Sequence, residues 1–437
     1  MQKKQQDDYK IKLLSLSILL GFIITSCGNS PTSLSSSTKT ADHKHNENLP
    51  TPTIKVYVEN SGSMDGYVKG ATDFKNAVYS YLSDIQLTYL RSNTDSTASH
   101  KNQLELNYIN SRIIPQQPNL LSFIKSLEPY SFKQKSGNPG ISDMADILDK
   151  IIEQTSDTDI SIFVSDCIFS PGKQYKQKDN ADEYLVRQQI AIKSHYAEKL
   201  SQDSNFAVIV MRLKSQFNGL YYNKFDDKTN IKGNRPFYIW LMGDTKQLKR
   251  LMQAVNVSEI KGSGVQNIYM ASRSASLSYG ILPQSGIGKF NPDRSNPKTT
   301  IINAKTDNKN GKNRFQLSIG VDYSRMFLPD EYLTDPNNYT ISNKAYTMEV
   351  VKHSNPRSSY THIIKLNLIQ PLISKGTIKI SLQNILPSWI NTYTDEVGLD
   401  INTDNAMEKT YGLKYLIGGI YDAYKHRDYG NITINIK

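Results

Sequence analysis

The sequence predicts an α/β fold: a doubly wound, mainly parallel sheet followed by a β-rich C-terminal domain. Two observations predict it. Between residues 53 and 256, short apolar runs rich in β-branched residues alternate with segments of helical periodicity, which is typical of a parallel sheet covered on both faces. In residues 257–437, period-two runs separated by turns predominate, a pattern typical of an antiparallel sandwich.

The spacing of the apolar residues predicts each element in turn. In the first domain we expect strands at 54–58, 104–109, 159–164, 206–211 and 236–242. Helices are expected at about 74–85, 120–127, 142–152, 183–200 and 244–255. In the second domain we expect strands at 315–321, 346–351, 362–368, 377–382 and 432–436, and one helix at about 411–424.

The first 26 residues have the pattern of a secretory signal peptide. Four lysines precede an uncharged apolar run at 13–25, which is too short to span a bilayer. The run ends in Ile24, Thr25, Ser26 and Cys27, and this ending resembles the lipobox of bacterial lipoproteins. The resemblance implies cleavage before Cys27 and a diacylglyceryl group plus a third acyl chain on it, enough chains for stable anchoring. The alternative is an ordinary signal peptide with an unrelated cysteine.

Residues 27–52 are predicted to be a flexible tether, because they are rich in Ser, Thr, Asn and Pro and have no apolar period. The formal net charge of the whole chain is +11, and it is +9 without residues 1–26, which carry four lysines and two aspartates. In a bacterial envelope this basicity favours anionic lipid or glycan surfaces over nucleic acid. Residues 28–30 lack the acidic run of some surface-exported lipoproteins, so we expect the protein to face the periplasm.

Oxygen-bearing side chains gather where the predicted strands end. Glu59, Ser61 and Ser63 follow the first strand, Ser142 begins a helix, and Asp166 follows the strand at 159–164. Ligands of such sheets bind at the carboxyl ends of the strands. Carboxylates and hydroxyls suit Mg²⁺ or another divalent cation that keeps some of its waters. The sequence therefore predicts an open metal site at this edge.

The segment from Val58 to Met64 resembles the Asp-x-Ser-x-Ser motif of von Willebrand factor A domains, the first part of their metal-ion-dependent adhesion site. Residues 140–142 and 162–166 are similar to the later parts of that site. The resemblance implies a metal bound directly by Ser61 and Ser63, with Glu59, Ser142 and Asp166 bound directly or through water. It also implies that an acidic side chain of a partner protein completes the coordination, and that the domain binds rather than catalyses.

One residue departs from the family motif, and several of the candidate ligands have simpler explanations. Position 59 is Glu where the family has Asp, and Mg²⁺ demands near-ideal geometry. Ser142 alone would be explained as a helix cap, Asp166 as a turn former and residues 61–63 as a plain loop. Cys167 is expected to be a buried thiol.

Two other functions compete: an envelope hydrolase with its active site in the C-terminal half, and a structural lipoprotein that uses the fold as a metal-free scaffold.

Overall fold

The described part of the chain contains the two predicted β regions but not the N-terminal segment. The computed structural model describes residues 50, 52–90, 103–133, 143–176, 180–273, 277–309, 311–324, 326, 328–355, 357–403, 405–425 and 428–437. The predicted signal peptide, Cys27 and nearly all of the tether lie outside these residues, and so does Ser142.

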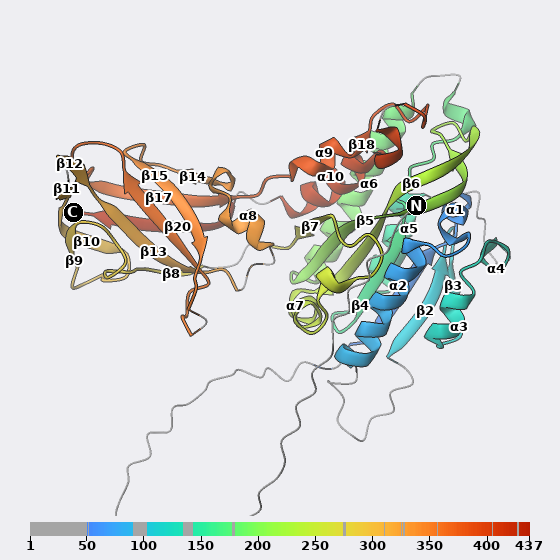
Figure 1. Cartoon of the computed structure of the whole chain (residues 1–437), viewed down its shortest axis with the longest axis horizontal. Coiled ribbons are helices and arrows are strands. Elements are labelled where there is room, and N and C mark those ends of the chain that lie inside the picture. The colour runs from blue at the N-terminus through green and yellow to red at the C-terminus, as the bar shows by residue number, and fades with distance from the viewer. Residues whose placement is uncertain are drawn as a thin grey trace, which may run out of the picture. The chain divides into compact units, whose positions relative to one another are not determined.

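A seven-stranded mixed sheet forms the centre of the α/β part, in the order β3-β2-β1-β4-β6-β5-β7 (Figure 1). Its strands are β1 (Ile54–Glu59), β2 (Leu104–Ile109), β3 (Ile113–Pro115), β4 (Ile160–Ser165), β5 (Phe206–Tyr222), β6 (Lys228–Asp244) and β7 (Asn267–Ala271). Four strands, β1, β2, β4 and β5, run in one direction, and the other three run in the opposite direction. The predicted α/β class is therefore confirmed, with a sheet that is mixed.

The strand predicted at 236–242 lies within β6, which runs antiparallel to both of its neighbours, β4 and β5. β5 and β6 form one long hairpin that pairs from Phe206↔Asp244 to Tyr222↔Lys228, and β6 lies between β4 and β5. The first half of β5 and the second half of β6 are almost wholly buried. The remaining halves of the two strands, which lie next to the turn of the hairpin, are largely polar. Apolar periodicity therefore predicts only the buried halves, at 206–211 and 236–242, and not the polar part of the hairpin that joins them.

Helices cover both faces of this sheet (Figure 1). Apolar residues of α2, α3 and α7 share one core with the sheet, and those of α5, α6 and the later helix α10 (Leu413–Tyr424) share the other. The helices of the α/β part are α1 (Asp65–Val68), α2 (Asp73–Asp84), α3 (Leu120–Lys125), α4 (Pro129–Lys133), α5 (Met144–Glu153), α6 (Ala181–Gln202) and α7 (Thr245–Ala254). The starts of α2 and α7 follow from caps, because Thr72 and Asp244 accept backbone N–H groups of the first turn. None of the described helices combines the length and apolarity needed to cross a bilayer.

Two further sheets enclose a third core and form a sandwich. Their orders are β14-β17-β20-β10-β9 and β15-β16-β13-β8. The strands are β8 (Ser278–Ile281), β9 (Lys289–Pro292), β10 (Thr300–Lys305), β13 (Gln316–Asp322), β14 (Tyr339–Ile341), β15 (Tyr346–Lys352), β16 (His362–Leu368), β17 (Gly376–Gln383) and β20 (Asp428–Ile436). A short hairpin, β11 (Asp307–Lys309) with β12 (Lys312–Arg314), and α8 (Asp330–Thr334) accompany them. All five strands predicted for this half are present.

The chain leaves the sandwich after β17 and returns to the α/β part. This segment contains α9 (Ser388–Thr392), β18 (Thr394–Asp395), β19 (Thr410–Tyr411) and α10 (Leu413–Tyr424). Leu413, Leu416, Ile417 and Ile420 are fully buried in the core that α5 and α6 share with the sheet. The predicted boundary at residues 256 and 257 therefore does not separate the cores, because β7 and α10 both lie beyond it.

Candidate metal site

The loop after β1 brings two hydroxyl groups together. Ser61 is buried, and its Oγ lies 3.0 Å from the Oγ of Ser63. The tight turn Gly62–Met64 between β1 and α1 allows this approach. A Cβ on Gly62 would lie 2.9 Å from the hydroxyl of Tyr222, so a larger residue here would displace the end of that side chain. The predicted convergence of the two serines is present in the structure.

Asp166 lies beside this loop, because β1 and β4 are parallel neighbours and their carboxyl ends coincide. Its side chain is only 1% exposed, and Oδ1 accepts the Ile168 N–H at 3.3 Å. The other oxygen, Oδ2, is buried and has no hydrogen-bond partner among the described residues. Burial raises the pKa of Asp166, while the Arg235 guanidinium and the Ser63 hydroxyl partly counteract this rise.

Arg235 is a buried cation at this site that the sequence analysis missed. It lies in the outer half of the β5–β6 hairpin, is 1% exposed, and stacks over the Tyr221 ring at 4.9 Å from the ring centroid. Its Nε and Nη1 atoms have no hydrogen-bond partner within the described part of the chain. Arg235 belongs to no sequence motif. It lies near the end of β4 because β6 pairs with β4 in the sheet. The site therefore contains a fixed positive charge.

Glu59 has a different environment from the two serines. It is 1% exposed, and the hydroxyl of Ser165, the last residue of β4, donates a hydrogen bond to its carboxylate. The same Ser165 oxygen accepts the Cys167 N–H at 2.7 Å. Cys167 is a free, buried thiol as expected, and burial raises its pKa well above the ordinary value. The Glu59 side chain, which is longer than the Asp of the family motif, is thus hydrogen-bonded to Ser165 of the neighbouring strand β4.

The helix expected to begin at Ser142 begins two residues later. Its first residue is Met144, and the cap is Asp143, whose carboxylate accepts the Asp146 N–H at 3.1 Å. Whether Ser142 contributes a ligand stays a prediction, since Ser142 lies outside the described residues.

The groups that the structure brings together fit a hard divalent cation. Two serine hydroxyls and a buried carboxylate with an unpartnered oxygen are oxygen donors of the kind that Mg²⁺ accepts alongside water. The described residues contain no cluster of three or more His, Cys, Asp or Glu side chains suited to a metal. Arg235 opposes a cation, because it already places positive charge beside Asp166.

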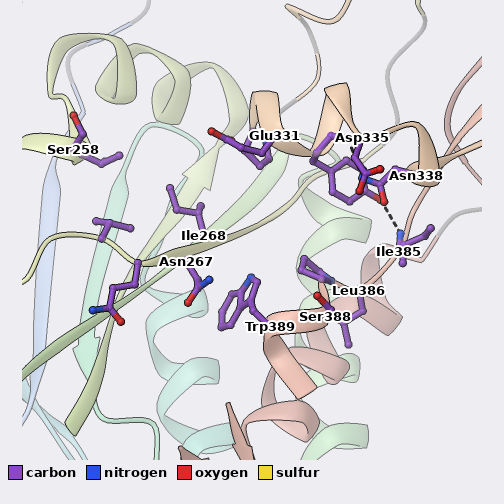
Figure 2. Close-up of a pocket in the computed structure, with 16 residues that line it drawn as sticks. Ser258, Asn267, Ile268, Glu331, Asp335, Asn338, Ile385, Leu386, Ser388 and Trp389 are labelled. Carbon is purple, nitrogen blue, oxygen red and sulfur yellow. Dashed lines mark hydrogen bonds between the residues drawn. The ribbon is translucent and has the colours of Figure 1, made fainter. Parts of the chain in front are cut away.

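A cavity of about 680 Å³ lies elsewhere, bordered by β7, α8 and residues 385–389 (Figure 2). Two acidic residues line it, Glu331 and Asp335. Glu331 is exposed, whereas Asp335 accepts the Asn337 N–H at 2.9 Å. An envelope hydrolase with its site in the C-terminal half stays a prediction, and this cavity is where its carboxylates would lie.

Comparison with models of protein families, with curated proteins and with solved structures finds no match to this chain.

Proposed function

We propose that this chain is a membrane-anchored lipoprotein of a bacterial envelope whose α/β domain binds a protein ligand through a divalent cation. The supporting observation is the buried Oδ2 of Asp166, which lacks a hydrogen-bond partner among the described residues and belongs to the same site as the Ser61 and Ser63 hydroxyls. A buried polar atom without a partner costs about 1–3 kcal/mol, and a bound cation would remove this cost.

In this proposal Ser61 and Ser63 hold the cation directly, and Asp166 holds it directly or through water. The bound cation would supply a vacant coordination position for an acidic side chain of the partner. Glu59 is bonded to Ser165 and acts by contributing negative charge nearby. The chain's own residues thus supply two neutral donors and the charge of Asp166, which suits weak, reversible binding.

The anchoring part of the proposal depends on Cys27 and the apolar run before it. Acyl chains on Cys27 would hold the folded part at a membrane, and residues 28–52 would separate the two. Replacing Cys27 with serine should move the protein from the membrane fraction to the soluble fraction of cells. Retention in the membrane fraction would contradict lipid anchoring at this position.

Arg235 favours a second candidate, a metal-free scaffold. A guanidinium close enough to lower the pKa of Asp166 balances its charge without a metal. In that case Ser61 and Ser63 only shape the loop, and any partner binds to the fold itself.

Calorimetric titration with Mg²⁺ separates the two candidates. The protein is the mature chain carrying Cys27→Ser, so that it is soluble. We expect one binding event, weakened at least about tenfold by Asp166→Ala. The matched control is Asp157→Ala, which removes an exposed carboxylate in the turn before β4 and should leave the affinity unchanged.

Arg235→Met provides the second arm of this experiment. If a cation binds, removing the positive charge should strengthen Mg²⁺ binding about fivefold or more. If the site is a scaffold, the same variant should lose stability and bind no Mg²⁺, since it leaves Asp166 without a nearby positive charge. Absence of binding by the wild-type chain, or equal binding by Asp166→Ala, would exclude the metal site.

A further inference from the structure

The cavity shown in Figure 2 runs along the edge of the seven-stranded sheet. β7 is the last strand in the sheet order, and it pairs with β5 from Val208↔Ala271 to Arg212↔Asn267. No described strand pairs with its other edge. Asn267 and Ile268 of β7 line the cavity, and they lie opposite Glu331 and Asp335 in the view. The edge strand of the sheet therefore lies beside a cavity.

Two cavities border residues 267–270 of β7, and the larger one contacts Asn267 and Ile268. A second cavity, of about 20 Å³, is lined by Ile268, Tyr269 and Met270 and shares Pro329 and Tyr332 with the first. Its walls are mainly apolar and aromatic. The walls of the larger cavity include Val257, Val265, Ile268, Leu386, Pro387 and Trp389. An extended chain beside β7 would place every second side chain against these walls.

The charge of the cavity is opposite to that of the molecule. Glu331 and Asp335 are the charged residues among those that line the larger cavity, in a chain whose formal net charge is +11. Neither carboxylate takes part in an ion pair within the described part of the chain. Two unpaired carboxylates beside apolar walls favour a partner that carries both aliphatic and basic side chains.

We propose that β7 and this cavity bind an extended peptide segment of another protein, which adds a strand to the sheet. Main-chain hydrogen bonds to β7 provide affinity, as in other domains that recognise peptides at a sheet edge. An aliphatic or aromatic side chain enters the cavity between Ile268 and Trp389, and a lysine or arginine faces Glu331 and Asp335. This second protein-binding surface is independent of the proposed metal site.

A displayed library of random heptapeptides, panned against the mature chain carrying Cys27→Ser, tests this proposal. We expect enrichment of peptides in which apolar residues alternate with others and at least one residue is basic. Glu331→Lys should weaken binding of an enriched synthetic peptide about tenfold or more. The control Glu153→Lys makes the same charge change at an exposed position at the end of α5 and should change binding less than about twofold.

Peptide binding is also measured with one further variant of the protein and with one modified peptide. Ile385→Arg places a cation at the cavity through a side chain that is 43% exposed, so it should abolish binding without unfolding the protein. Methylation of alternate backbone nitrogens of the peptide should also abolish binding, because these groups pair with the edge of β7. Failure to enrich any peptide, or equal binding of the methylated peptide, would overturn strand addition. The latter result would indicate a site for side chains or small amphipathic cations only.

Discussion

At the scale of the residue, the buried positive charge of Arg235 near Asp166 opposes a cation at the predicted site. Both side chains are 1% exposed, and each has polar atoms without a partner among the described residues. A buried charge costs several kcal/mol unless another charge or a cation compensates it. Asp166 could be predicted because it follows a buried strand, whereas Arg235 carries no pattern. Arg235 reaches Asp166 because β6 pairs with β4 in the sheet, although the two residues lie about 70 positions apart in the sequence.

His362 is a second buried ionisable group, and it predicts a pH dependence of stability. It is 2% exposed and lies edge-on to the Tyr323 ring. Burial lowers its pKa, the Asp330 carboxylate partly offsets this effect, and the Lys352 ammonium adds to it. The folded protein therefore binds fewer protons here than the unfolded chain does just below pH ~6.5. The free energy of unfolding should fall as the pH falls through this range.

Urea unfolding between about pH 5 and pH 8 checks this expectation. We expect His362→Gln to reduce the slope of stability against pH below about 6.5, by up to ~1.4 kcal/mol per pH unit. Asp330→Asn removes the charge that favours the protonated imidazole and should steepen the loss instead. Identical slopes in the wild type and in His362→Gln would show that this histidine does not contribute.

At the scale of the element, strands were predicted better than their connections. The strand at 362–368 has the predicted limits in β16, and 377–382 lies within β17, because alternation of apolar residues reflects one buried face. The outer part of the β5–β6 hairpin, between about 214 and 235, is largely polar and carries no such alternation. Its pairing is decided by contacts across the hairpin rather than by a buried face.

The start of α10 offers a test of how tightly this helix packs. Gly412 precedes α10 with a φ of +79°, and a Cβ there would lie 2.3 Å from Cδ2 of Phe169. We expect Gly412→Ala to lower the free energy of unfolding by about 3 kcal/mol or more, from backbone strain together with overpacking. Urea denaturation of the mature chain provides the measurement.

Gly311 provides the matched control for this substitution. It has a similar φ of +73°, but apart from its chain neighbours no atom of the described residues lies within 4 Å of the position that a Cβ would take. Gly311→Ala should therefore cost only the backbone strain, about 1 kcal/mol. Equal losses for the two variants would mean that α10 can move away from Phe169 without cost.

At the scale of the whole molecule, the α/β core is completed by residues distant in sequence. β7 and α10 lie beyond residue 256, and α10 buries Leu413, Leu416, Ile417 and Ile420 in the core containing α6. Each such side chain contributes about 1.5–3 kcal/mol on burial, and the total stability of a domain is only about 5–15 kcal/mol. Fragment 53–256 should therefore fail to fold cooperatively.

Circular dichroism and thermal melting of two proteins, residues 53–256 and residues 53–437, measure this difference. We expect a cooperative transition for the longer protein and a weak or absent one for the shorter. A fragment with the same melting temperature as the longer protein would show that α10 and β7 are accessory to the core. The metal titration and peptide experiments accordingly use the whole mature chain.

Sequence pattern predicts the α/β class, most strand positions, the convergence of Ser61 and Ser63, and the placement of Asp166 beside them. These features follow from local periodicity and from the rule that parallel strands end at one edge of a sheet. The tertiary structure decided the antiparallel insertion of β6, the return of α10 to the first core, the bond from Ser165 to Glu59, and the burial of Arg235. Each depends on contacts between segments far apart in the chain, and such contacts leave no local pattern.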